Sequence, residues 1–318
     1  MNSELVNGLF AGRASATAAL GAAASGKALD FADPYDNLYA FGKIWGSYAE
    51  PVLSGFHGLM YARLGAQRLI PLFGYTGTGC MQSKLDEERN VWIRGKETGY
   101  FTDLATGEIL ETWKNPWTGK TVEVFNFYNP TMGGKLTAEM PRFAMGAARD
   151  DATLMNDGTH RNTGGTVPFI LPFEQYGDDL MLAWDYAHEY TNPVTLEGWP
   201  EASTGPRISP SEHFTFCMSL TEMRDRSVPS SRFVAGFSRL GQWWPWMRMG
   251  GHELAETGVV FGRMFSHKGL QGPGDIPPKV LAYIEKHAPE YLTVPDHWPN
   301  VTPHGTWEAF ANEVPREV

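Results

Sequence analysis

The sequence is poor in cysteine, with only Cys80 and Cys217 among its 318 residues. Two cysteines cannot make the disulfide framework of a small secreted domain or a four-cysteine zinc site. The chain also lacks an excess of positive charge, because its formal net charge is −10. A nucleic-acid partner is therefore not expected. No apolar run approaches the roughly 20 residues of a membrane-spanning helix, so no membrane partner is expected.

The sequence motifs of common cofactor and metal sites are also missing. No G-x-G-x-x-G run follows a predicted strand, and neither G-x-S-x-G nor H-E-x-x-H occurs. The glycine-rich run 74–79 (GYTGTG) lacks the lysine of a phosphate-binding loop, and its composition predicts an ordinary loop. A metal site would need distant histidines to meet in the folded chain, the candidates being His160, His188, His213, His252 and His267. The sequence therefore predicts a protein without a cofactor or a metal.

Aromatic residues and turn formers are abundant, with 11 Trp, 18 Phe, 35 Gly and 22 Pro. Many short β-branched and aromatic runs alternate with turns, and only 277–288 has a clear helical pattern. This predicts an all-β fold, either an antiparallel β-barrel or a strongly curved sheet, lipocalin-like, with a few short helices capping it. The predicted organisation is an N-terminal loop and helix segment over 1–54 and a single β-barrel-like domain over 55–310 that includes the C-terminal helical cap.

The region from Val91 to Pro130 contains three strand-like runs, at 91–102, 108–114 and 120–128. Thr106-Gly107 and Thr118-Gly119 separate them, and glycine adopts the positive φ of a tight turn at little cost. The pattern predicts three strands that pair consecutively and antiparallel. The third run has no purely apolar face, which is typical of a wall beside a mixed cavity or of a sheet edge covered by a loop. Phe127 is a candidate ligand contact there.

The run 180–190 (LMLAWDYAHEY) predicts a strand with an aromatic face. Because side chains alternate along a strand, Trp184, Tyr186, His188 and Tyr190 share that face. An imidazole can transfer protons near neutral pH, and a phenol can donate a hydrogen bond to it. His188 is therefore the candidate general base or acid, Tyr186 its partner, and Trp184 and Tyr190 are candidate substrate contacts. The alternative is an aromatic core strand in which His188 binds a backbone carbonyl.

The run 242–251 (QWWPWMRMGG) is the most unusual local composition in the chain. Three tryptophans around a proline, with two methionines, indicate an apolar plug or lid. Trp246 and Met249 are the candidate substrate contacts here, and Trp246 is expected to reach the same cavity as the strand at 180–190. A cap over one end of the sheet is the alternative interpretation.

Several segments together carry a family resemblance. They are Tyr100-Phe101-Thr102-Asp103, the run 112–119 (TWKNPWTG), the segment 243–250, His267-Lys268-Gly269 and Trp307. With them the chain resembles the bacterial domain-of-unknown-function family 1838 over roughly residues 55–310. The resemblance implies a domain extent but no activity. Many members of that family carry a twin-arginine export signal, and the chain lacks the arginine pair; a cytoplasmic location is expected, with the periplasm as the alternative.

These observations lead to two main hypotheses about function. The first is a cofactor-independent lyase or isomerase that acts by acid–base catalysis on a hydrophobic, aromatic or polycyclic small molecule bound in a barrel cavity. The second is a binding protein that holds such a molecule without turnover, and metal-assisted hydrolysis is a less favoured third. An enzyme is expected to place at least two titratable groups with shifted pKa values in one cavity. The expected partner is the small molecule, and self-association into a homo-oligomer is left open.

Overall fold

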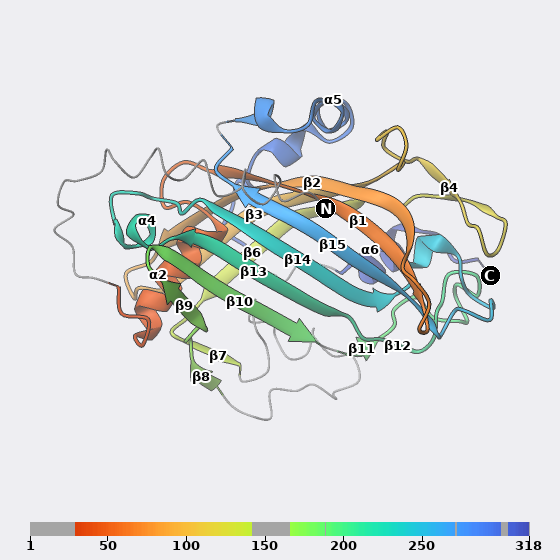
Figure 1. The fold of residues 1–318 in the computed structure, drawn as a ribbon, viewed down its shortest axis with the longest axis horizontal. Coiled ribbons are helices and arrows are strands. Elements are labelled where there is room, and N and C mark those ends of the chain that lie inside the picture. Colours follow the sequence, from red (N-terminus) through yellow and green to blue (C-terminus); the bar gives the residue numbers. More distant parts are fainter. Residues whose placement is uncertain (1–28, 142–165, 188, 271, 300–304, 318) are drawn as a thin grey trace.

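A large antiparallel sheet forms the centre of the computed structural model, which describes residues 29–141, 166–187, 189–270, 272–299 and 305–317. Nine strands follow one another in the order β6-β3-β2-β1-β15-β14-β13-β10-β9 (Figure 1). Their bounds are β1 Val52–Leu64, β2 Ile70–Leu85, β3 Val91–Thr102, β6 Phe127–Leu136, β9 Phe173–Tyr176, β10 Asp179–Ala187, β13 Ser211–Ser219, β14 Phe233–Gln242 and β15 Gly258–Lys268. Within the described residues the sheet is open, because its edge strands β6 and β9 do not pair with each other. The predicted antiparallel β fold with a few short helices is confirmed.

Smaller elements surround this sheet. Three two-stranded sheets pair β4 Thr112–Lys114 with β5 Thr121–Glu123, β7 Glu139–Pro141 with β8 Thr166–Pro168, and β11 Tyr190–Thr191 with β12 Arg207–Ile208. The helices are α2 Pro34–Trp45, α4 Leu220–Arg224, α5 Pro278–His287 and α6 Thr306–Glu313, with short 3-10 turns η2 Pro245–Met247, η3 Pro273–Asp275 and η4 Pro289–Leu292. In the described part of the chain, no helix has both the length and the apolar character needed to cross a membrane.

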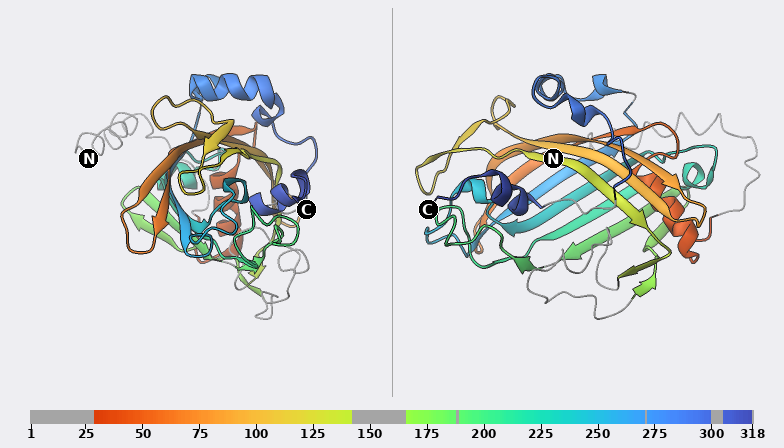
Figure 2. Two further views of the ribbon diagram at one scale, coloured as in Figure 1. Left: turned by 90° about the vertical axis from the view of Figure 1, so that its right-hand side faces the viewer. Right: turned by 180° about the vertical axis from the view of Figure 1, so that it is seen from behind.

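The sheet curves strongly, and helices occupy its two ends. Figure 2 shows α2 at one end of the concave face, α6 at the other, and α5 on the outside. Helix α2 begins where the Asp33 side chain accepts a hydrogen bond from the Tyr35 amide, with Pro34 in the first turn. Residues 36–44 of this helix are all buried, so α2 is a core element. The domain boundary predicted at residue 54 falls inside β1.

The core on the concave face has two parts. The α2 cluster joins α2 to β10 and β13 and includes Phe41, Leu182, Trp184, Phe216 and Met218. The tryptophan cluster, at the α6 end, includes Trp199, Trp243, Trp244, Trp246 and Trp307. Aromatic side chains bury large areas with few rotatable bonds, so both ends of the curved sheet are rigidly filled. The space between the two clusters is where a cavity can form.

The region 91–128 differs from the predicted three-stranded meander. Strand β3 has the predicted bounds, and β4 pairs with β5 as predicted. However, β3 meets the second run only at the isolated bridge between Thr102 and Ile109, and its partner in the large sheet is β6. The third run divides because the Asn126 side-chain oxygen accepts from the Phe101 amide at 3.0 Å. That bond replaces a strand-to-strand hydrogen bond and lets the chain pass from β5 into β6.

The glycine-rich run 74–79 is not the predicted loop but the middle of β2. Gly77 in this run, and Gly99 opposite it on β3, make room for aromatic rings that lie against the sheet. Gly77 pairs with Gly99 on β3, and a Cβ atom at Gly77 would stand 2.4 Å from Cζ of Phe56. A Cβ atom at Gly99 would stand 2.2 Å from the Tyr75 hydroxyl oxygen. Local composition indicated a loop, whereas contacts between distant strands determine where these glycines are needed.

Candidate functional site

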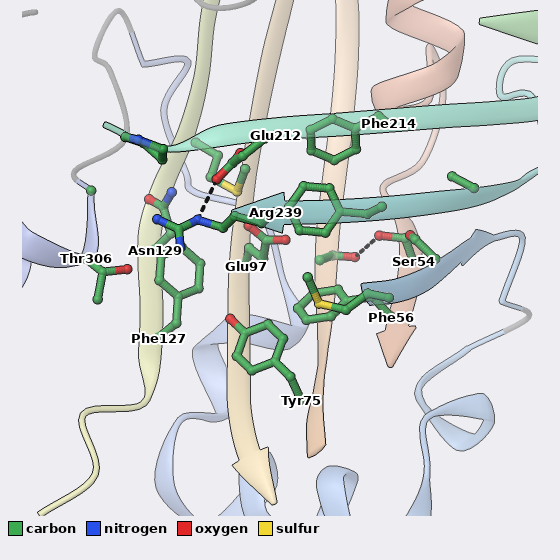
Figure 3. A pocket seen from close by; sticks show the side chains of 18 of the residues that line it. Ser54, Phe56, Tyr75, Glu97, Phe127, Asn129, Glu212, Phe214, Arg239 and Thr306 are labelled. Carbon is green, nitrogen blue, oxygen red and sulfur yellow. Dashed lines mark hydrogen bonds and ion pairs between the residues drawn. The ribbon is translucent and has the colours of Figure 1, made fainter. Parts of the chain in front are cut away.

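A cavity of about 390 Å³ lies on the concave face of the sheet, with α2 at one end and α6 at the other (Figure 3). Most of its wall is apolar. Its phenylalanine rings come from five strands and the loop before β6, and they are Phe56, Phe101, Phe125, Phe127, Phe214, Phe216, Phe233 and Phe237. Four flexible methionines, Met60, Met81, Met132 and Met264, also line the cavity. Such a wall suits a flat apolar molecule, and methionine adapts to irregular shapes.

A small set of polar side chains faces this apolar space. Strand register brings Glu212 of β13 directly opposite Arg239 of β14, and Glu97 of β3 opposite Asn129 of β6. Strands β2, β1 and β15 separate β3 from β14 in the sheet. The curvature of the sheet is therefore what brings Glu97 toward the Glu212–Arg239 pair, as Figure 3 shows.

The Arg239 guanidinium group is held from several sides. Its Nε donates to Glu212 Oε1 at 2.9 Å, and the two side chains are 12% and 18% exposed. The carbon of the guanidinium lies 5.5 Å from the Trp244 ring centre and 5.4 Å from that of Trp307. Cation–π contacts of this kind are stronger where water is excluded. The position of Arg239 is thus determined by groups from β13, the 243–247 turn and α6.

Glu97 is the titratable group best suited to proton transfer. Burial is the larger cause that raises the pKa of its carboxyl group, and the negative charge of Glu212 adds to it, giving a pKa of about 7. A group with that pKa is present in both protonation states near pH 7. It can therefore take a proton from a bound molecule and return it.

Tyr75 supplies a hydrogen-bond donor beside this carboxyl group. Its ring stacks on Phe56 at 5.5 Å and tilts against Phe101 at 5.0 Å, measured between ring centres. Burial, and then the charge of Glu97, raise the pKa of the Tyr75 phenol above its usual value. The phenol therefore keeps its proton at pH 7 and can donate it in a hydrogen bond.

The predicted site residues fall into three groups. Phe127 and Tyr190 line the cavity. Trp184 is buried in the α2 cluster and touches the cavity wall indirectly, with its ring 5.3 Å from that of Trp45. Only the backbone of Tyr186 in β10 can be described, and His188 lies outside the described residues.

Trp246 and Met249 lie in the tryptophan cluster and are almost completely buried. Trp246 was expected to contact the cavity, but it is not among the residues that line this one, and Trp244 lines it instead. The η2 turn sets the two rings 6.5 Å apart and nearly parallel. Trp246 then packs against Phe73 and Phe101 beneath the cavity wall.

Sequence reasoning missed Glu97, Glu212 and Arg239, although each leaves a signal. Each is the charged member of an otherwise apolar strand face. The three faces are Val91-Ile93-Glu97-Phe101, Glu212-Phe214-Phe216-Met218 and Phe233-Ala235-Phe237-Arg239. A charge on a core-facing position is either paired or functional, so the sequence pattern marks these three positions as candidates, although Lys268 on β15 carries the same signal.

The histidines considered for a metal site do not supply one in the part of the chain that the structure describes. Among those residues, no three or more His, Cys, Asp or Glu side chains come together to hold a metal ion. His160 and His188 lie outside the described residues. Metal-assisted hydrolysis thus has no ligand set among the described side chains.

Comparison with known proteins agrees with the motif resemblance. The chain belongs to the family described as "Protein of unknown function (DUF1838)", whose model matches residues 50–314. The match runs from just before β1 to the end of α6, and so includes every strand of the large sheet. A search of curated proteins gave no match.

Proposed function

We propose that this member of the DUF1838 family is a cofactor-independent enzyme, an isomerase or lyase, that moves a proton on a hydrophobic small molecule of aromatic or polycyclic type. The observation that carries the proposal is the Glu97 carboxyl group, with a pKa of about 7, facing an apolar cavity of about 390 Å³. The proposal includes the lipocalin-like arrangement predicted from the sequence, in which the ligand is held inside the curved sheet.

Each neighbouring group has a role in that chemistry. The Glu97 carboxylate takes a proton from the substrate, and the apolar wall keeps water away from the charge that develops. Tyr75 donates a hydrogen bond to the reacting region because its phenol stays protonated. In an isomerase Glu97 returns the proton at another carbon; in a lyase the electron pair left behind expels a leaving group. General acid–base help of this kind typically supplies about 10² to 10⁴ in rate.

His188 with Tyr186 remains the competing prediction for the catalytic pair, since Tyr190 next to them lines the same cavity. The non-catalytic binding protein is the second candidate function, and the mostly apolar wall with its four methionines favours it. The two candidates differ in whether proton exchange accompanies binding.

Hydrogen–deuterium exchange tests the proposal without knowledge of the natural substrate. The protein is incubated in deuterated buffer with a panel of aromatic and polycyclic ketones, and deuterium uptake at carbon is followed by NMR. The wild type is expected to accelerate exchange on at least one ketone, and Glu97→Gln to reduce that rate about 10²- to 10⁴-fold.

His188→Gln serves as the matched variant in the same assay. If His188→Gln abolishes exchange and Glu97→Gln does not, His188 is the base and the assignment to Glu97 is wrong. Binding of panel members without exchange in the wild type favours the binding protein over the enzyme.

A further inference from the structure

We infer that Arg239 forms a subsite for an oxygen acceptor, so that the ligands of this cavity are apolar molecules carrying a carbonyl group. The inference deepens the proposed function and rests on it for the reaction, but the binding preference it predicts can be measured without any turnover.

The evidence is the uncommitted part of the guanidinium group. Arg239 lines the cavity, and its one side-chain hydrogen bond to the described residues runs from Nε to Glu212. Nη1 is a buried nitrogen without a hydrogen-bond partner among those residues. Buried donors in native proteins nearly always have an acceptor, so one left open beside a cavity points to an acceptor on the ligand.

The guanidinium group is also fixed in place before any ligand arrives. Glu212, Trp244 and Trp307 hold it, and it lies beside Gly241 of its own strand. A Cβ atom at Gly241 would stand 3.1 Å from Nη1, so the absence of a side chain there lets the group lie close to β14. A donor held rigidly in a place with little water stabilises developing negative charge without reorganisation.

Charge balance favours a neutral carbonyl over a carboxylate. Glu212 already compensates the positive charge of Arg239, and ionised Glu97 adds negative charge to the same cavity. A carbonyl oxygen accepts the hydrogen bond without that repulsion. During the proposed reaction, Glu97 takes the proton from the carbon next to the carbonyl group. The electron pair of the broken C–H bond forms a C=C bond, and the carbonyl π pair moves to the oxygen, facing Arg239.

Three probes of one size measure this preference: methyl naphthyl ketone, ethylnaphthalene and naphthoate. Their affinities are read from quenching of tryptophan fluorescence and checked by calorimetry. The wild type is expected to bind the ketone about tenfold more tightly than ethylnaphthalene, the effect of one hydrogen bond to a charged group. Arg239→Met should reduce this preference to about one, with the affinity for ethylnaphthalene changed less than twofold. Naphthoate should bind more tightly as the pH falls through about 7, because Glu97 becomes neutral.

Control variants separate this inference from folding and from catalysis. Arg239→Lys keeps the charge and replaces Arg239→Met as the test variant if the latter fails to fold. It should retain only part of the preference for the ketone. Glu97→Gln should keep the full preference even though turnover is lost, so a failed exchange assay does not decide the subsite. The inference is overturned if the wild type binds the ketone no more tightly than ethylnaphthalene. It is also overturned if the wild type binds neither of these two probes. It is equally overturned if Arg239→Met weakens ketone and ethylnaphthalene to the same extent.

Discussion

Two sets of buried charges lie against the same curved sheet and are built in opposite ways. Near α2, the Lys43 ammonium group donates to three carbonyl oxygens, those of Glu222, Met223 and Asp225. The Lys268 ammonium group also donates to three carbonyl oxygens, those of Lys43, Ile44 and Gly46 at the end of α2. Both lysines therefore have an acceptor for every N–H bond. Nearer α6, the Arg239 guanidinium group keeps donors without an acceptor among the described residues.

The difference indicates which charges serve the fold and which serve a ligand. Burial lowers the pKa of both lysines, that of Lys43 to about 8, whereas the carbonyl acceptors favour the ammonium form. Lys268 lines the cavity just as Arg239 does, so position alone does not separate them. What separates them is whether the protein itself satisfies the donors.

The largest expected effect comes from removing a satisfied charge. Lys268→Met removes three hydrogen bonds from a charged group, each worth about 1.5 to 3 kcal/mol, and leaves the Ile44 carbonyl oxygen without a donor among the described residues. The carbonyl oxygens of Lys43 and Gly46 each keep a second donor, the Ser231 amide and the Ser230 hydroxyl group. We expect the free energy of unfolding, measured by urea denaturation, to fall by about 3 to 5 kcal/mol. The double variant Glu212→Gln/Arg239→Met is the matched comparison, because it leaves no unpaired carboxylate, and it should cost less than half as much. Equal losses for the two variants would contradict the distinction drawn here.

Glu97→Gln should act in the opposite direction and depend on pH. The folded pKa of about 7 lies above the ordinary value of 4.5, so the protonated form favours the folded state. Below about pH 4.5 the wild type and the variant should be equally stable. As the pH rises from there to about 7, ionisation costs the wild type roughly 1.4 kcal/mol per pH unit, and the variant avoids this cost. At pH 8 the variant should be more stable by on the order of 2 to 3 kcal/mol. A stability difference that stays constant with pH would show that Glu97 is not shifted.

Some of this organisation could be predicted from the sequence because it depends on neighbours in the chain. Strand β3 has its predicted bounds, and α5 begins one residue after the predicted start, since local alternation and a proline in the first turn determine both. The site could not be predicted in the same way, because it depends on the register between strands that are distant in the sequence. Glu97 and Arg239 are 142 positions apart in the numbering, and only the curvature of the whole sheet brings them to one cavity. The sequence also could not distinguish Trp244 from Trp246 as the cavity contact, because composition does not show which ring of a turn points inward.

The smallest expected effect sharpens the same comparison by moving Arg239 without removing it. In Gly241→Ala the new Cβ atom would stand 3.1 Å from Nη1, so the guanidinium group must shift by a few tenths of an ångström. We expect the preference for methyl naphthyl ketone over ethylnaphthalene to fall about two- to threefold, and stability to change by less than about 0.5 kcal/mol.

The matched control for that change is Gly236→Ala on the same strand, where the nearest atom outside the chain neighbours is Nη2 of Arg263, at 3.7 Å. This variant gains the same methyl group at an ordinary contact distance. It should leave the preference unchanged, and a loss as large as that in Gly241→Ala would mean that Arg239 placement is not responsible.

The hydrogen bonds between Lys268 and the end of α2 also have a consequence for biosynthesis. The bonds to Lys43, Ile44 and Gly46 span 222 to 225 positions of the chain. Ribosomes add about 5 to 20 residues per second, so α2 emerges on the order of ten to fifty seconds before the strand that anchors it. During the first part of that interval its aromatic residues lack the partners that are made later, such as Trp184 and Phe216. We expect the N-terminal helix to dock late, and nascent chains to depend on chaperones until β15 has been made.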